Sequence, residues 1–244
     1  MRFRSPLIDR TSLIIAAVLA ALTIVCVLVV DRAAAYWVRD LDPVVRAPFM
    51  AIRNVGEGSY WLIPSALIAL IALIAAWRAK GRRWSPLVAT LGRAALFVFT
   101  TLAMSSIALH IIKAVVGRAR PRMLMREDVY GFAPFNIDSD FSSLPSGHTN
   151  TLFAAALALG YLAPRFCVPF LAIALIFSAP RVFAGSHFPG DVLAGIALAV
   201  VIAPLIHRWF EAKRLLFVPE ASGGTKRVLT VALLKRLWRR AWFR

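Results

Sequence analysis

The sequence predicts an all-α integral membrane protein with six transmembrane helices. Apolar residues make up 60% of the 244 positions, and the mean hydropathy is +0.72. Such values are typical of membrane proteins rather than of soluble domains. Several apolar runs also approach the roughly 20 residues that a helix needs to cross a hydrocarbon core of about 30 Å.

Six apolar runs define the predicted spans. They cover residues 12–30, 60–77, 94–112, 149–163, 166–179 and 192–206. The first run resembles a signal peptide, but it is longer than the roughly 7–15 apolar residues of such peptides, so we interpret it as an uncleaved span. The fourth and fifth runs are short for a crossing. We therefore expect neighbouring polar residues to extend those two helices.

The distribution of basic residues predicts the orientation in the membrane. With the N-terminus on the cytoplasmic side, the inner segments carry a net charge near +15 and the outer segments a net charge near +1. The positive-inside rule selects this arrangement. The formal net charge of +17 is interleaved with apolar runs and accompanies no nucleic-acid motif. It therefore indicates anionic lipid, and not nucleic acid, as the partner of the basic residues.

Two flanking segments are expected to lie at the membrane surface. Residues 1–59 should comprise the first span and an outer interfacial segment, in which four arginines recur every seven residues, at positions 32, 39, 46 and 53. We expect this stripe to face solvent or headgroups. Residues 207–244 form a basic tail, whose last part, KRVLTVALLKRLWRRAWFR, mixes aromatic with basic residues. That mixture predicts an amphipathic helix on the anionic lipids of the cytoplasmic leaflet.

Three polar clusters lie at the outer ends of the predicted spans. They are KAVVGRARP at 113–121, PSGH at 145–148 and RVFAGSHFPGD at 181–191. Ser146 and Arg181 are 35 residues apart, enough for one helix of about 26 Å inward and another back. The second and third clusters should therefore meet, and Lys113 ends the third span on the same side.

The residue types in these clusters suit a tetrahedral oxyanion. Lys113, Arg120 and Arg181 supply three cations, and guanidinium forks match phosphate oxygens. Ser146 and the amides around Gly147 would add neutral donors at a helix N-terminus. The set therefore predicts a phosphate receptor.

Two histidines and an aspartate complete the predicted chemistry. His187 and Asp191 are spaced i, i+4, so Asp191 could accept a hydrogen bond from one ring nitrogen while the other attacks phosphorus. Pro189 and Gly190 disfavour a regular helix there, so the contact could form across a turn. We assign His148 as the group that protonates the leaving oxygen and later activates water. This division of roles predicts phosphoryl transfer through a phosphohistidine.

Together the three clusters resemble the motifs of the type 2 phosphatidic acid phosphatase family, which is related to the vanadium haloperoxidases and bacterial acid phosphatases. Six residues separate Lys113 from Arg120-Pro121, and Pro-Ser-Gly-His follows. Five residues then separate Arg181 from His187, and three separate His187 from Asp191. The resemblance implies a six-span fold with an acid phosphatase/vanadium haloperoxidase-like lipid phosphatase core at 60–206. It also implies no metal or other cofactor, and an outward-facing site for lipid phosphates.

The resemblance leaves the substrate and the acceptor open. Candidates are undecaprenyl diphosphate, phosphatidylglycerophosphate, phosphatidic acid and the lipid A 1-phosphate, in a bacterial inner membrane with the site facing the periplasm. A phosphotransferase would use the same site and pass the phosphoryl group to a lipid hydroxyl. An anion transporter is less favoured, because the charges gather at one face. Pro180 stands where the family usually has serine, so substrate range could differ. The oligomeric state is not indicated.

The loop after the first cluster contains further charged residues. Four acids, Glu127, Asp128, Asp138 and Asp140, could hold a divalent cation, but their spacing matches no metal-binding loop and the basic clusters would repel a cation. We therefore expect no metal. Three arginines, at positions 118, 122 and 126, could hold lipid headgroups or belong to a solvated loop. Both interpretations stay open from the sequence.

Overall fold

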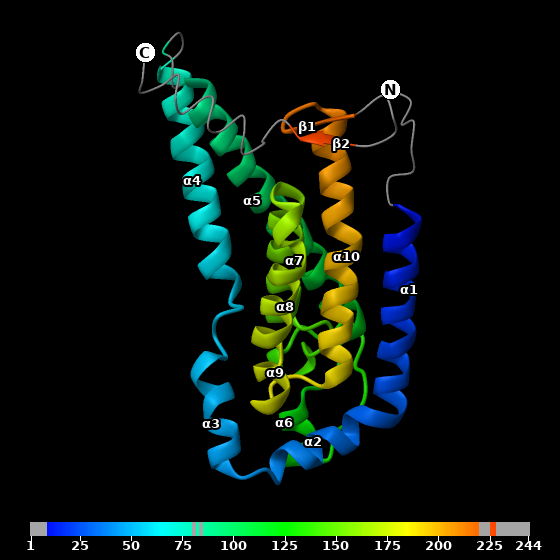
Figure 1. Cartoon of the computed structure of the whole chain (residues 1–244). Helices are drawn as coiled ribbons and strands as arrows, with labels where there is room; N and C mark the ends of the chain where they lie inside the picture. The colour runs from blue at the N-terminus through cyan, green and yellow to red at the C-terminus, as the bar shows by residue number, and fades with distance from the viewer. Residues whose placement is uncertain (1–8, 80–81, 83–84, 220–224, 228–244) are drawn as a thin grey trace.

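The computed structural model is an elongated helical bundle (Figure 1). It describes residues 9–79, 82, 85–219 and 225–227. Three helices, α5 (Ser85–Val116), α7 (Gly147–Leu162) and α10 (Pro189–Ala212), pack against one another in its centre. Three others cover them: α4 (Gly58–Arg78) packs on α5, α8 (Cys167–Ser178) on α7, and α1 (Arg10–Val25) on α10.

Hydrophobic exposure indicates which helices face lipid. Large apolar side chains on the three covering helices are exposed, including Ile24 on α1 at 60%, Ile71 on α4 at 65% and Val168 on α8 at 75%. By contrast, small residues of α7, such as Ala154 and Ala158, are completely buried. Small residues allow helices to approach closely where lipid supplies no hydrophobic driving force. α7 is therefore shielded from lipid by its neighbours, whereas α5 also exposes apolar side chains such as Ile111, at 60%.

Within the described residues, five helical segments are long and apolar enough to cross a membrane. They are Arg10–Arg39, Gly58–Arg78, Ser85–Val116, Pro164–Phe183 and Pro189–Ala212. The remaining predicted span corresponds to α7, which has only 16 residues and lies inside the bundle. The prediction of an all-α membrane fold is thus confirmed for the bundle, whereas the count of six crossings stays a prediction.

The first outer segment forms two helices instead of one interfacial helix. A π-helical turn, Cys26–Val30, connects α1 to α2 (Asp31–Arg39), and α3 (Pro43–Ile52) follows after a break. Asp42 ends the first stretch and caps the second, accepting a hydrogen bond from the Val44 amide at 2.7 Å, and Pro43 begins α3. Proline is favoured in a first helical turn because it lacks an amide proton. The predicted arginine stripe is therefore divided between two helices.

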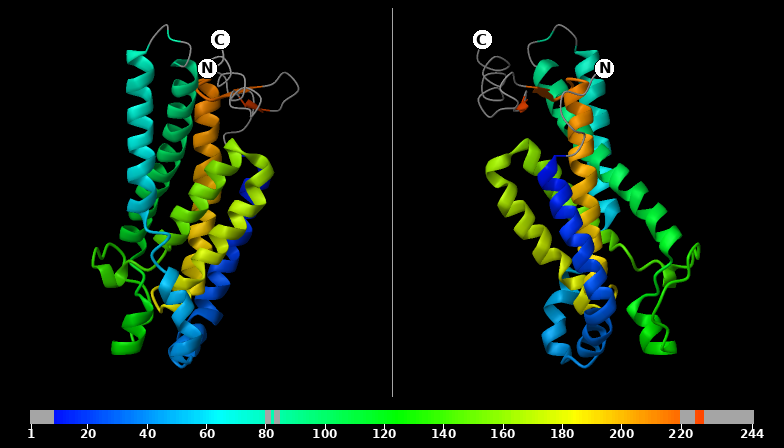
Figure 2. Two further views of the ribbon diagram at one scale, coloured as in Figure 1. Left: turned by 60° about the vertical axis from the view of Figure 1, so that its left-hand side comes forward. Right: turned by 90° about the vertical axis from the view of Figure 1, so that its right-hand side faces the viewer.

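The outer end of the bundle is where α5 ends and α7 and α10 begin. Two short helices, α6 (Pro121–Glu127) and α9 (Pro180–Phe183), lie there with α2 and α3 (Figure 1). Figure 2 shows α6 and its loops on the side away from the α7–α8 hairpin. A 3-10 turn at Ser139–Phe141 precedes α7 at this end, whereas the one at Pro164–Phe166 joins α7 to α8 at the far end of that hairpin. All three motif clusters lie at the outer end.

The opposite end carries a two-stranded antiparallel sheet that the sequence analysis did not predict. Strands β1 (Phe217–Pro219) and β2 (Thr225–Arg227) pair there, and Phe97 packs edge-on against Phe210 and Phe217. Lys226 and Arg227, the first residues of the predicted amphipathic tail, belong to β2 and not to a helix. The remainder of that tail lies outside the described residues.

Candidate active site

The fold brings the three motif clusters to one place. Lys113 lies in the last turn of α5, Arg120 precedes α6, Arg181 lies in α9, and His148 lies in the first turn of α7. His148 is close enough to interact electrostatically with all three cations and with His187. The predicted meeting of the clusters across two helices is therefore seen in the structure.

The three cations are held by backbone carbonyls and not by carboxylates. Lys113 Nζ donates to Ser142 O at 2.7 Å, and Arg120 Nε donates to Ser139 O at 2.8 Å. Arg181 Nη1 lies 3.4 Å from Arg53 O, and within the described part of the chain the buried Arg181 Nε has no hydrogen-bond partner. Burial, followed by the charge of Arg122, lowers the pKa of Arg120. Positive charge is thus concentrated at this site, and none of the described acidic residues pairs directly with these three cations.

The Pro-Ser-Gly-His segment starts α7, with Ser146 as its N-cap. Ser146 is completely buried; its amide donates to Asp191 O at 2.9 Å, and its hydroxyl accepts from Thr149 Oγ1 at 3.1 Å. The Ser146 amide therefore anchors the motif to Asp191 and is not free to bind phosphate. The sequence alone had predicted that the amides around Gly147 donate to phosphate. The amides of Gly147 and His148 belong to the first turn, where amides lack intrahelical acceptors.

The geometry around His187 fixes which ring nitrogen carries the proton. His187 is 3% exposed, and its Nδ1 lies 2.9 Å from Ser143 O. A carbonyl oxygen only accepts hydrogen bonds, so Nδ1 must be the donor and Nε2 retains its lone pair. Burial lowers the pKa of His187 to about 4, so the ring is neutral near pH 7. The neutral ring presents the tautomer that a nucleophile needs.

Asp191 supports this arrangement indirectly. Its Oδ2 lies 3.6 Å from His187 Nδ1, beyond ordinary hydrogen-bond distance. Oδ2 instead accepts from Ser143 Oγ at 2.6 Å and from the Phe188 amide at 2.8 Å. Because α10 begins only at Pro189, Asp191 caps that helix while His187 precedes it. The predicted direct bond is therefore replaced by a link through Ser143, whose carbonyl holds His187 and whose hydroxyl holds Asp191.

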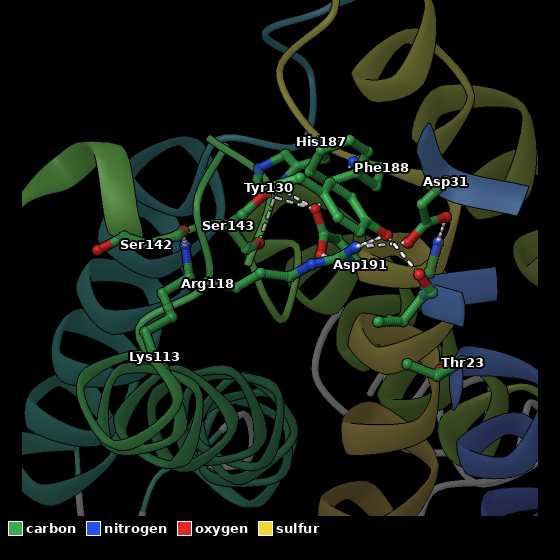
Figure 3. Close-up of polar contacts among 12 residues, drawn as sticks. Thr23, Asp31, Lys113, Arg118, Tyr130, Ser142, Ser143, His187, Phe188 and Asp191 are labelled. Atoms are coloured by element: carbon green, nitrogen blue, oxygen red, sulfur yellow. Dashed lines mark hydrogen bonds and ion pairs between the residues drawn. The ribbon is translucent and has the colours of Figure 1, made fainter. Parts of the chain in front are cut away.

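A buried ion network extends from Asp191 to the first span (Figure 3). Arg118 lies between two carboxylates: Nη1 donates to Asp191 Oδ1 at 2.6 Å and Nη2 donates to Asp31 Oδ2 at 2.8 Å. Arg118 is 1% exposed and its guanidinium lies 4.5 Å from the centre of the Phe188 ring. Burial disfavours its charge, but Asp191 and Asp31 outweigh burial and raise the pKa of Arg118. Both sequence interpretations of Arg118, as a headgroup ligand or a solvated loop residue, are wrong.

Two glycines of α10 allow these contacts. A Cβ at position 195 would lie 2.7 Å from Ser146 O, and one at position 190 would lie 2.6 Å from Asp31 Oδ2. Such separations are too short for a side chain, so only glycine lets α10 approach the start of α7 and the carboxylate of Asp31. The Gly190 amide also donates to Asp31 Oδ1 at 2.9 Å.

The four loop acids do not form a common site. Asp128 Oδ1 accepts from Arg32 at 3.1 Å, Asp140 pairs with Arg122, and Asp138 Oδ1 accepts from the Asp140 amide at 2.9 Å. Among the residues that the structure describes, no three His, Cys, Asp or Glu side chains are grouped as metal ligands. Local pairing thus accounts for Asp128, Asp138 and Asp140, and independence from metal stays a prediction.

Comparison with known proteins identifies the family. The family model described as the PAP2 superfamily matches residues 94–215, half of the chain, and this range contains all three motif clusters. The chain belongs to the PAP2 superfamily. This PAP2 protein is 32% identical over 200 residues to a lipid A 1-phosphatase of Rhizobium johnstonii, and the match covers 78% of each chain.

Two further relatives bear on the fold and the activity. An undecaprenyl-diphosphatase of Bacillus subtilis is 28% identical over 94 residues, which are 38% of this chain and 47% of that one. The crystal structure of a transmembrane PAP2-type phosphatidylglycerolphosphate phosphatase from Bacillus subtilis covers 83% of this chain and 95% of its own, with a TM-score of 0.51 and 21% identity. That likeness confirms the fold. The chain is thus a membrane lipid phosphatase of the PAP2 superfamily.

Proposed function

We propose that this PAP2 protein hydrolyses a phosphate monoester or diphosphate of a membrane lipid through a phosphohistidine intermediate. The observation that carries the proposal is the environment of His187. Its neutral ring is oriented by Ser143 O at 2.9 Å, and His148 and the cationic cluster lie nearby. This environment supports the roles of nucleophile for His187, proton donor for His148 and oxyanion clamp for the three cations.

In the first step, His187 Nε2 attacks phosphorus and the bond from phosphorus to the lipid oxygen breaks. Lys113, Arg120 and Arg181 stabilise the charge on the phosphoryl oxygens. Burial and the neighbouring cations lower the pKa of His148 to about 3. The bound phosphate, which is anionic, offsets those cations and favours protonated His148, which then donates its proton to the departing oxygen. Attack makes the His187 ring cationic, and Asp191, 3.6 Å from Nδ1, lowers the energy of that cation. In the second step, His148 takes a proton from water, which attacks phosphorus, releases phosphate and regenerates His187.

The environment of Gly147 supports this placement of the phosphate. A Cβ added at Gly147 would meet only Leu109, at an ordinary 3.8 Å. Packing within the described protein therefore does not require glycine at this position. We assign the adjoining space to the phosphoryl group, which would approach the first-turn amides of α7.

The substrate class follows from the relatives and the membrane setting. We propose a lipid-linked phosphate in the bacterial inner membrane, with the lipid A 1-phosphate first among the candidates because a lipid A 1-phosphatase matches 78% of the chain. Phosphatidic acid, phosphatidylglycerophosphate and undecaprenyl diphosphate are the comparison substrates. Assaying the purified protein in detergent with all four, and measuring free phosphate beside any newly phosphorylated lipid, tests both the substrate and the acceptor.

The proposed orientation predicts the accessibility of the two ends. In a variant lacking Cys26 and Cys167, a cysteine at Ile137, which is 87% exposed beside the site, should react in intact cells with an impermeant thiol reagent that reaches the periplasm. A cysteine at Lys213, exposed at the end of α10, should react only after the membrane is permeabilised. The opposite labelling pattern would place the site in the cytoplasm.

The buried environment of His187 predicts an unusually acidic limb in the pH profile of kcat/KM. Only the neutral ring can attack, and with a pKa of about 4 the ring stays neutral until the pH falls through that value. An ordinary histidine would lose activity below about pH 6.5. Profiles for a monoester and a diphosphate separate ionisation of the enzyme from that of the substrate. A loss of kcat/KM centred near pH 6.5 with both substrates would contradict the assignment of His187 as a buried, neutral nucleophile.

The cationic cluster predicts turnover without a divalent metal. If Lys113, Arg120 and Arg181 compensate the phosphoryl charge, excess EDTA should leave the rate unchanged and vanadate should inhibit, since it can adopt the five-coordinate geometry of the transition state. Arg120→Ala or Arg181→Ala should weaken vanadate inhibition together with turnover. Asp128→Asn, which changes an exposed loop acid, is the control and should retain activity. Loss of activity in EDTA and its recovery with Mg²⁺ would argue for a metal mechanism.

A further inference from the structure

A second cationic site lies beside His187. A cavity of about 210 Å³ is bounded by α2, α3, α6, α9 and the loop before α10, and His187 and Phe188 form part of its lining. Four arginines also line it, at positions 39, 46, 122 and 126. Lys113, Arg120 and Arg181 are not among its lining residues within the described chain. The cavity therefore adjoins the catalytic cluster but uses a separate set of cations.

The arginines differ in how far their charge is already paired. Arg39 is bound to Asp40 at 2.7 Å, and Arg122 pairs with Asp140. The Arg46 side chain donates to a neutral acceptor, Phe183 O, at 3.2 Å. No hydrogen bond or ion pair joins Arg126 to another described residue. Since the described lining contains no acidic residue, Arg46 and Arg126 give the cavity a net positive charge.

Most of the rest of the lining is apolar and includes Val38 from α2, Met125 from α6 and Val182 from α9. Such a mixture disfavours a free hydrated ion and suits an anionic group carried on a sugar or hydrocarbon framework, because guanidinium groups bind phosphate while their stems cover apolar surface. The four arginines that recur every seven residues in the first outer segment fall into two environments. Arg39 and Arg46 line the cavity, whereas Arg32 and Arg53 are exposed outside it.

We propose that this cavity binds a second phosphate of the same lipid, distinct from the phosphate that His187 removes. The inference rests on the proposed function. It narrows the substrate class of the protein to lipids that carry two separated phosphates, such as a bisphosphorylated disaccharide lipid. The cavity would position the distal phosphate while the proximal one enters the Lys113, Arg120 and Arg181 cluster. Selectivity then comes from the part of the lipid that does not react.

The test compares two lipid probes in a neutral detergent. The detergent carries no phosphate, so a phosphate in the cavity can come only from the probe itself. One probe is lipid A with phosphates at positions 1 and 4′, and the other is the same lipid with the 1-phosphate alone. The variant is Arg46→Gln combined with Arg126→Gln. The matched controls, Arg32→Gln and Arg53→Gln, remove cations of the same outer segment that lie outside the cavity.

We expect the wild-type protein to release the 1-phosphate from the bisphosphorylated probe with a kcat/KM about tenfold or more above that of the monophosphorylated probe. In the double variant this ratio should fall to within about twofold of unity, mainly through KM, while turnover of the monophosphorylated probe stays at the wild-type level. The control variants should keep the wild-type ratio. Retention of hydrolysis of the monophosphorylated probe also shows that the double variant is folded.

Several results would overturn the inference while leaving the proposed function intact. These are equal wild-type kcat/KM for the two probes, an equal loss on both probes in the double variant, or loss of the ratio in the control variants. If phosphatidylglycerol accelerates hydrolysis of the monophosphorylated probe and the double variant loses this effect, a neighbouring lipid occupies the cavity and the inference is again wrong. If wild-type protein releases phosphate from none of the lipid phosphates, the proposed function itself fails.

Discussion

Replacing His187 with alanine is expected to abolish both phosphate release and the acid-labile phosphoenzyme. The ring supplies the atom that bonds to phosphorus, and within the described residues its neutral tautomer depends on a single backbone acceptor, Ser143 O at 2.9 Å. Asp191→Asn should keep the fold of the α10 N-terminus but weaken support of the cationic ring, lowering the rate by about 10²–10⁴ by analogy with the orienting acid of hydrolase triads. Rapid quenching with a phosphate-labelled lipid, followed by acid and base treatment of the protein, measures the intermediate.

The two histidines can be separated by the leaving group. His148→Ala should slow a lipid alkoxide far more than p-nitrophenolate, because the activated group needs little protonation as it departs. His187→Ala should remove both activities equally. His110→Ala, which changes an exposed histidine of α5 three residues before Lys113, is the matched control and should behave as wild type. A phosphoenzyme that persists without His187, or equal losses on both substrates without His148, would contradict these assignments.

The meeting of the clusters could be predicted because it depends on helix geometry alone. An apolar stretch between Ser146 and Arg181 of the length of two short helices can only go inward and return, which places both motifs at one surface. The alignment of Lys113 with them follows from the same argument. The membrane class was equally accessible, because lipid requires long apolar helices whatever their detailed packing.

What the sequence did not reveal depends on contacts between distant segments. Asp31 and Arg118 are separated by 87 positions, and nothing in the spacing of either pairs them. Ser143 is one of several serines before the Pro-Ser-Gly-His motif, and its role arises only because α10 begins close to that loop. One signal was available: an aspartate at the end of a long apolar run must either reach water or find a buried cation. Arg118 was misplaced for a related reason: in sequence it belongs to a series of loop arginines, whereas the fold places it between the buried carboxylates of Asp31 and Asp191.

Replacing Arg118 with methionine is expected to cause the largest loss of stability among single substitutions in this region. Methionine approximates the length of the side chain but leaves Asp31 and Asp191, both completely buried, without their shared cation. Breaking a buried pair by removing one partner costs about 3–5 kcal/mol in other proteins. The Tm in detergent should fall by many degrees, and turnover should fall because Asp191 loses the contact at Oδ1 that fixes its orientation. Arg32→Met, which removes an exposed pair with Asp128, should change stability by no more than about 1 kcal/mol.

A double-mutant cycle tests whether the network acts as a unit. Asp31→Asn retains an oxygen that can accept from the Gly190 amide, and it leaves Arg118 with one carboxylate, so its own cost should be smaller than that of Arg118→Met. Combining Asp31→Asn with Arg118→Met removes one buried charge of each sign, so the double variant should be more stable than Arg118→Met alone. Additive losses, or an Arg118→Met variant that melts with wild type, would show that Arg118 does not balance these carboxylates. Coupling between positions 31 and 118 would instead establish that the first span, which contributes none of the three motifs, helps to hold Asp191 behind His187, because Arg118 bridges the two aspartates.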